Sequence, residues 1–341
     1  MEFLYEYGMF VAKVLTIVLA ILVAVVGIIV AVSKNKEEHK EHIEIKKLND
    51  KYEDIKFSMK SLMLNKAGLK KLEKEQKAKE KAEKKAPEEE DKQRIFVVDF
   101  DGDIKASAVT NLREEITAIL MVARKQDEVF VRLQSPGGMV NTYGLAASQL
   151  TRVKDKEIGL TIAVDKVAAS GGYMMACVAD KILAAPFAIL GSIGVVAQIP
   201  NFNRLLKKHD VDYEMITAGE YKRTLTMFGE NTDQARSKFK DDIEDIHVLF
   251  KDFVVQHRPV VDIAKVSTGE FWFGTRAKDL DLVDELQTSD DYLLEKVTEA
   301  DLYSVKHVEK KNLSDKFSGF LQNVSEKVMT GWWSKSQENS L

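Results

Sequence analysis

A serine that follows an apolar segment is the residue of this chain best suited to chemistry. Ser170 lies in an Ala-Ser-Gly-Gly tetrad at 169–172, after the β-branched run 159–164, which predicts a strand, and before the run 173–179, which favours a helix. A helix N-terminus offers free N–H groups and a partial positive charge, which suit a nucleophile whose reaction forms an oxyanion. The alternative is a helix N-cap with glycines that only permit a tight turn.

A second glycine turn, Ser-Pro-Gly-Gly at 135–138, follows the predicted strand 128–134. Ligands of α/β folds gather at the carboxyl ends of strands, so the two turns are expected to meet at one edge of a sheet. The N–H groups of Gly138 and Gly171 could then hold the negative oxygen that forms when Ser170 attacks a carbonyl carbon. A Pro-Gly turn without any such role is the alternative.

These turns belong to a region in which strands and helices alternate, the pattern of an α/β layered domain. The predicted strands are 95–100, 128–134, 159–164 and 181–185, and the predicted helices are 109–125 and 141–154. A glycine-rich turn follows at 188–195.

The amino-acid composition excludes several classes of protein function. The chain has 341 residues, of which 45% are hydrophobic and 30% charged, yet its formal net charge is only −4. Lysines and glutamates are interleaved, so the chain lacks the segregated basic surface of a nucleic-acid-binding protein. Cys177 is the single cysteine, which excludes an intrachain disulfide. The six histidines do not have metal-ligand spacing, so we expect no metal and no cofactor.

The N-terminal part predicts a membrane anchor. Residues 14–32 carry no charge, and a helix of that length spans the hydrocarbon layer of a bilayer, about 30 Å thick. A cleaved signal peptide is the alternative.

We divide the chain into a transmembrane anchor at 1–33, a charged connector at 34–93, a functional domain at 94–300 and an amphipathic tail at 301–341. Lysines follow the span, which favours a cytoplasmic domain by the positive-inside rule.

Five short motifs in series resemble those of the signal peptide peptidase A family of serine peptidases. Each motif alone is a weak signal, but their order over residues 94–300 is specific. The motifs are SPGG at 135–138, ASGGY at 169–173, GSIGV at 191–195, AGEYKR at 218–223 and GEFWFG at 269–274.

The resemblance implies a crotonase/Clp-like fold and a Ser–Lys dyad, with Ser170 as nucleophile and Lys222 as general base. Lysine can take this part because burial lowers its pKa from about 10.4, so that it accepts the serine proton. The choice of Lys222 over other lysines rests on the resemblance alone.

The resemblance also concerns residues outside the dyad. Gly137, Gly191, Ser192 and Ile193 are predicted to line the substrate groove beside the nucleophile. Asp281 stands where the family has a glycine, and aspartate tolerates the left-handed conformation needed there. We expect the aromatic run 271–273 to lie in the core.

The expected partners are a peptide or protein substrate, membrane lipid, and further copies of the chain, with dyads shared between the subunits of a homo-oligomer. The resemblance implies the bacterial inner membrane and favours its periplasmic side, against the lysine bias, so the side stays open. The sequence leaves two alternative functions open. One is a crotonase-type acyl-CoA enzyme, which would use carboxylates instead of a serine. The other is a catalytically silent peptide-binding scaffold.

Overall fold

The computed structural model describes residues 7–20, 42–83 and 92–308, which fall into two units. Of the first unit, the helical segment 7–20 is described. Ile43–His307 form the second unit, which holds the sheets and the predicted functional residues. Among the residues described, no helix has both the length and the apolar character needed to cross a bilayer. The predicted span 14–32 continues into residues outside the described part, so it stays a prediction.

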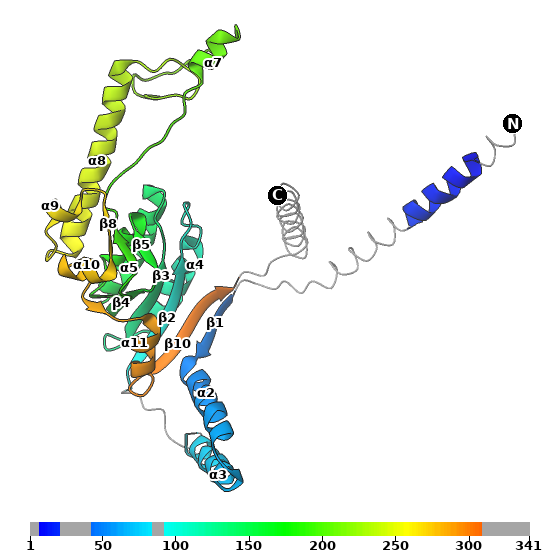
Figure 1. Cartoon of the computed structure of the whole chain (residues 1–341), viewed down its shortest axis with the longest axis vertical. Helices are drawn as coiled ribbons and strands as arrows, with labels where there is room; N and C mark the ends of the chain where they lie inside the picture. The colour runs from blue at the N-terminus through cyan, green and yellow to red at the C-terminus, as the bar shows by residue number, and fades with distance from the viewer. Residues whose placement is uncertain (1–6, 21–41, 84–91, 309–341) are drawn as a thin grey trace, which may run out of the picture. The chain divides into compact units, whose positions relative to one another are not determined.

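Parallel strands form the centre of the second unit (Figure 1). The main sheet has seven strands in the order β1-β10-β2-β3-β4-β6-β9, and β10 through β9 pair in parallel. Its strands are β1 (His42–Lys47), β2 (Arg94–Asp101), β3 (Glu128–Gln134), β4 (Gly159–Val164), β6 (Lys181–Ala184), β9 (Glu285–Leu286) and β10 (Asp301–Val308). A second sheet of three strands has the order β5-β7-β8, namely Val167–Ala169, Ile189–Gly191 and Phe271–Phe273.

Helices connect these strands, and the predicted mixed α/β class is therefore confirmed. The predicted helices 109–125 and 141–154 correspond to α4 (Val109–Val122) and α5 (Val140–Lys154). The remaining helices are α2 (Leu48–Met63), α3 (Lys66–Glu83), α6 (Gly171–Ala176), α7 (Asn203–Lys208), α8 (Asp233–His257), α9 (Ile263–Val266), α10 (Gly274–Asp279) and α11 (Ser289–Lys296).

The two faces of the main sheet pack into separate cores because successive strand residues point to opposite sides. In β2, Phe96 and Val98 join the larger core, which contains residues of α4, α5 and α6. Ile95 and Val97 join a smaller core with Tyr292 of α11. Helices thus cover both faces, as expected for a parallel sheet.

Two segments assigned to the connector and the tail form the two outermost strand positions on one side of the main sheet, with β1 at the edge and β10 next to it. β1, within the predicted connector, pairs with β10, whose residues begin the predicted tail. Asn49 of α2 stabilises this edge through three hydrogen bonds. Its Nδ2 donates to the carbonyl oxygens of Val297 and Ala300 at 3.0 and 2.9 Å. Its Oδ1 accepts from Leu302 N at 2.8 Å. Residues 309–341 lie outside the described part, so the amphipathic tail stays a prediction.

The segment between β7 and α8 extends from the sheets as an arm, here defined as residues 195–232. Figure 1 shows α7 beyond the N-terminal end of α8, away from the main sheet. The arm exposes apolar side chains to an extent that is unusual for a soluble surface. Among them are Val196, Leu205, Val211, Ile216, Tyr221 and Phe228.

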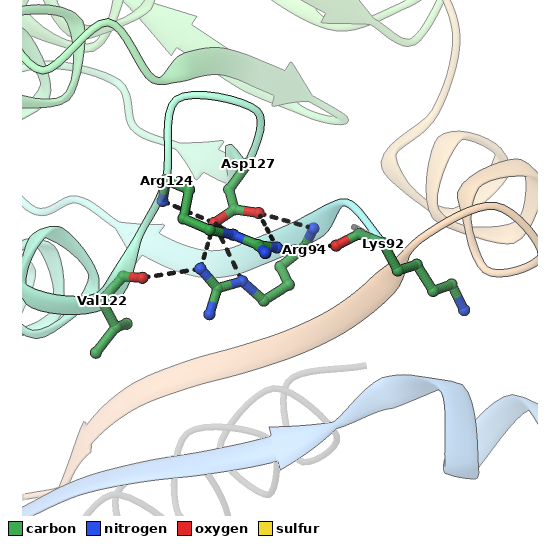
Figure 2. A network of polar contacts seen from close by, with 5 residues as sticks. All are labelled: Lys92, Arg94, Val122, Arg124 and Asp127. Atoms are coloured by element: carbon green, nitrogen blue, oxygen red, sulfur yellow. Dashed lines mark hydrogen bonds and ion pairs between the residues drawn. The ribbon is translucent and has the colours of Figure 1, made fainter. Parts of the chain in front are cut away.

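A buried carboxylate fastens the starts of β2 and β3 (Figure 2). Asp127 has no exposed side-chain surface and accepts from the side chains of Arg94 and Arg124. The same two arginines donate to the carbonyl oxygens of Val122 and Lys92, at 2.8 and 2.9 Å. Burial opposes ionisation of Asp127, but the arginine hydrogen bonds outweigh it and lower its pKa to about 2. The network therefore needs the ionised carboxylate.

Replacing this carboxylate is expected to destabilise the fold. In Asp127→Asn the amide NH₂ would face guanidinium groups, and the free energy of unfolding is expected to fall by about 3 kcal/mol. Because the folded-state pKa lies below the value of about 4 for unfolded aspartate, the stabilisation is complete above pH 4 and is lost as the pH falls toward 2. Urea titrations of wild type and variant at several pH values measure both effects.

The exposed pair of Asp99 with Arg132 provides the matched control. Asp99→Asn is expected to change the free energy of unfolding by less than about 1 kcal/mol. Equal losses in the two variants would show that the Asp127 network has no special stabilising effect.

Candidate active site

Ser170 occupies a strained turn between β5 and α6. Its backbone has φ 51° and ψ −117°, a conformation that residues other than glycine rarely adopt. The turn is held at both ends, since Ser170 N donates to Gly191 O at 2.8 Å and Ser170 O accepts from Met174 N at 2.9 Å. Within the described residues, the Ser170 hydroxyl has no hydrogen-bond partner. The predicted position of the serine at a strand-to-helix turn is confirmed.

The turn at 135–138 packs directly against Ser170. Gly137 has φ +88°, and a Cβ added to it would lie 2.8 Å from both Ser170 Cβ and Gly171 N. Contacts this short leave no room for a side chain, so the close approach of the turns requires glycine. The main chain joins the same segments, because Ala169 N donates to Ser135 O at 3.0 Å. The two glycine turns meet, as the order of the strands predicts.

A cavity of about 80 Å³ opens beside the serine, and Gly138, Ser170 and Gly171 all line it. In the part of the chain that the structure describes, no group accepts a hydrogen bond from the N–H of Gly138 or Gly171. Such unpartnered donors next to a free hydroxyl form the arrangement that an oxyanion requires. The remaining lining residues are Val140, Met174, Gly194, Val195, Val196, Ile246 and Phe250.

The turn after β7 contacts the serine turn at Gly191, one of its three predicted groove residues, and lines the cavity through Gly194. Gly191 accepts from Ser170 N through its carbonyl oxygen, and Ser192, at φ 52°, donates its own N–H to Glu270 O at 2.7 Å. Ile193 is fully buried in the core. Gly194, one residue further, lines the cavity.

Sequence analysis missed the contribution of α8, from which Ile246 and Phe250 reach the cavity. Their spacing of four residues places them on one helical face, but a stripe of this kind is equally typical of a core helix. Nothing local connects α8 with the serine turn, so no sequence signal distinguishes these two positions.

Lys222 does not lie beside Ser170 in the described chain. It is exposed, it belongs to the arm, and its backbone N–H donates to Gly219 O at 3.2 Å. It is absent from the residues that line the serine cavity, and so is every histidine in the described part of the chain. Among the described residues, no histidine, cysteine and carboxylate side chains are grouped so that they could hold a metal ion.

Of two further predictions, one is confirmed and the other is wrong in part. Asp281 adopts φ 59°, which confirms its predicted left-handed conformation. The expectation that residues 271–273 lie in the core was wrong for two of the three. Phe271 and Phe273 are 56% and 44% exposed, because they lie on the opposite face of the small sheet from Trp272, which is half-buried and packs against Gly191.

Two family models and several relatives match this chain. Residues 2–150 match peptidase family S49 N-terminal, and residues 152–303 match peptidase family S49. The chain is 52% identical over 333 residues to probable protease SohB of Haemophilus influenzae, which covers 93% of this chain and 92% of that protein. It is 46% identical over 330 residues to probable protease SohB of Buchnera aphidicola from Acyrthosiphon pisum, covering 96% and 97%.

A solved structure of a mutant 1510-N membrane-bound stomatin-specific protease with a substrate peptide is also similar. It has a TM-score of 0.42 and 12% sequence identity, and the match covers 68% of this chain and 99% of that one. The family matches and the close relatives define a serine-type peptidase, a hydrolase. The chain belongs to peptidase family S49.

Proposed function

We propose that this chain is a membrane-anchored serine endopeptidase that uses Ser170 and Lys222 as a catalytic dyad. The observation that carries the proposal is the geometry at the cavity: a serine whose hydroxyl has no described partner lines it together with two glycines whose N–H groups have no described acceptor. An acyl-CoA enzyme of crotonase type needs such N–H donors but no serine, whereas a serine peptidase needs the N–H donors and the serine nucleophile. The sheet with its parallel strands and glycine turns is compatible with a crotonase/Clp-like fold.

The reaction follows from these positions. Ser170 Oγ attacks the peptide carbonyl carbon while its proton passes to the neutral amine of Lys222, and the carbonyl oxygen becomes an oxyanion held by the N–H groups of Gly138 and Gly171. Collapse of this intermediate breaks the C–N bond, and the leaving amine takes the proton from Lys222. Water then attacks the carbonyl carbon of the acyl-enzyme while Lys222 accepts a proton from it. The bond between that carbon and Ser170 Oγ breaks, Ser170 Oγ takes the proton back from Lys222, and the acid product leaves.

A dyad shared between subunits agrees with the position of Lys222. The lysine is exposed on an arm that leaves the sheets and carries apolar side chains suited to burial against another copy. Since each copy would supply one Ser170 and one Lys222, a closed ring of copies would complete every site. The charge-free run 14–32 supports anchoring in the bacterial inner membrane, where it would concentrate the subunits.

The experiment that tests this function is peptide hydrolysis by the full-length chain in detergent, with a library of unstructured peptides. We expect internal cleavage, and inhibition by fluorophosphonates. A chain that binds peptides but turns none over is instead the silent scaffold, and a chain that turns over acyl-CoA but no peptide is the crotonase-type enzyme. A reporter enzyme fused to the C-terminus determines which side of the membrane the domain faces.

The cavity predicts the substrate class. Its side walls are the apolar residues Val140, Met174, Ile246 and Phe250, and its volume of about 80 Å³ suits a small apolar side chain. We therefore expect peptides with alanine or valine at the cleaved position to react faster than peptides with phenylalanine or aspartate.

Enlarging the cavity is expected to change this preference. In Ile246→Ala the ratio of kcat/KM for phenylalanine over alanine substrates is expected to rise about tenfold, since a few methylene groups in an apolar pocket discriminate by this order. Val248→Ala is the matched control, because Val248 is on α8, is 40% exposed and does not line the cavity. An unchanged ratio in Ile246→Ala would show that the cleaved residue binds elsewhere.

A further inference from the structure

A buried relay of hydrogen bonds lies beneath the glycine turn that borders the active site. Gly137 N donates to Ser135 Oγ at 3.1 Å, Ser135 Oγ lies 2.5 Å from Tyr143 Oη, and Tyr143 Oη donates to Asp103 O at 2.7 Å. Because the tyrosine proton goes to Asp103 O, the Ser135 hydroxyl must donate to Tyr143. Each hydroxyl then donates once and accepts once, so the relay has a single direction.

Both side chains of the relay are inaccessible to water. Ser135 and Tyr143 have no exposed surface, and burial raises the pKa of the Tyr143 hydroxyl, which keeps it protonated and able to donate. The space around the two hydroxyls is closed, since a Cβ on Gly102 would lie 2.6 Å from both Ser135 Oγ and Tyr143 Oη. A water molecule cannot replace either hydroxyl without displacement of the surrounding backbone.

The ring of Tyr143 contacts the other half of the site. A Cβ added to Gly171 would lie 2.4 Å from Tyr143 Cγ, so the ring packs directly on the first residue of α6. One side chain on α5 therefore contacts both turns: its hydroxyl supports Gly137 through Ser135, and its ring supports Gly171. The two unpartnered N–H groups, those of Gly138 and Gly171, belong to these same turns.

The relay also uses the N–H of one glycine of the first turn and leaves that of the next one free. The N–H of Gly137 donates to Ser135 Oγ, whereas the N–H of Gly138, a residue that lines the cavity, has no acceptor among the described residues. Without an acceptor at Ser135, the turn at φ +88° could rotate its peptide groups, because glycine has no strong backbone preference.

We propose that Tyr143 is a positioning residue of the peptidase reaction, which acts through Ser135 and Gly171 to set the spacing of the two N–H groups that hold the oxyanion. This inference rests on the proposed function, in which Ser170 is the nucleophile. Because Tyr143 touches neither substrate nor the reacting atoms, its effect is on transition-state stabilisation and not on substrate affinity.

The test compares two tyrosine-to-phenylalanine variants in the full-length oligomer. Tyr143→Phe keeps the ring against Gly171 and removes only the hydroxyl of the relay. The matched control is Tyr292→Phe, which removes another buried hydroxyl, the donor of a 2.8 Å hydrogen bond to Glu128, in the smaller core on the opposite face of the main sheet. Both variants lose a buried hydrogen bond, so thermal unfolding measures a shared loss of stability.

For Tyr143→Phe we expect kcat to fall about 10- to 100-fold with KM changed less than about twofold, a loss typical of misplaced catalytic groups. A peptide aldehyde, which forms a tetrahedral adduct, should lose affinity by the same factor, while a product peptide should bind unchanged. Ser135→Ala should reproduce the effect, and the double variant should be no worse than either single one, because both act through one relay. Tyr292→Phe should keep the wild-type kcat.

Equal kcat values in Tyr143→Phe and Tyr292→Phe would overturn the proposal, as would a loss confined to KM. Fluorophosphonate labelling separates this failure from failure of the proposed function. If wild type is labelled at Ser170 and the Tyr143 variant keeps the full kcat, only the positioning role is wrong. If wild type is active but unlabelled at Ser170, the dyad itself is wrong.

Discussion

Replacing Ser170 with alanine is expected to abolish peptide hydrolysis while the fold stays intact. The hydroxyl is the only group at the cavity that can form the acyl-enzyme, so kcat is expected to fall by at least about a thousandfold. Stability is expected to change by less than about 0.5 kcal/mol, because this hydroxyl makes no hydrogen bond to any described residue. A continuous assay with a fluorogenic peptide, together with thermal unfolding, measures both quantities.

The control for this variant is Ser148→Ala. Ser148 lies on α5, and its hydroxyl donates to Gly144 O at 2.8 Å on the exposed side of the helix. Wild-type activity in this control shows that loss of a serine hydroxyl is not harmful in itself. If the Ser170 variant keeps more than a few per cent of wild-type kcat, the assignment of the nucleophile is wrong.

Replacing Lys222 with alanine is expected to cause an equally complete loss. Since no described histidine lines the cavity, the proton of Ser170 needs an acceptor from outside it, and the proposal assigns this to the lysine of a neighbouring copy. Lys208→Ala is the matched control, because Lys208 ends α7 in the same arm. Full activity of the Lys222 variant, or loss of activity on replacing His209, His247 or His257, would favour a histidine base.

Mixing the two inactive variants tests whether the dyad is shared. In co-expressed oligomers of Ser170→Ala and Lys222→Ala at equal amounts, a quarter of neighbouring pairs combine an intact serine with an intact lysine, so about a quarter of wild-type activity is expected. Co-purification through two different tags first establishes that mixed oligomers form. Mixed oligomers without any activity would show that each site is built within one chain.

The local parts of the site could be predicted from the sequence because their signals are local. A β-branched run, a serine, two glycines and a helical run occur in sequence around Ser170, and the turn at 135–138 follows β3, which pairs with the strand β4 formed by that run. The short strand β5, which leads into Ser170 and belongs to the second sheet, was not predicted. Parallel strands bring their carboxyl ends to one edge, so the meeting of the two turns follows from the order of elements alone.

Contacts between distant segments could not be predicted in this way. The pairing of β1 with β10 joins opposite ends of the second unit, and the residues of β1 read as part of a charged connector because the edge of a sheet accepts polar side chains. Ile246 and Phe250 reach the serine cavity from a helix more than 70 residues downstream. The prediction that residues 271–273 lie in the core was wrong in part. Aromatic side chains usually indicate a core, whereas an edge strand exposes alternate side chains.

The most direct test of the central claim is identification of the residue that a fluorophosphonate modifies. The full-length chain in detergent is treated with the probe until hydrolysis stops, and the modified peptide is sequenced by mass spectrometry. The account predicts one modified residue, Ser170, with modification proportional to the activity lost and greatly slowed in Lys222→Ala. Complete inactivation with the probe on a different residue, or an active enzyme that the probe leaves unmodified, would contradict it.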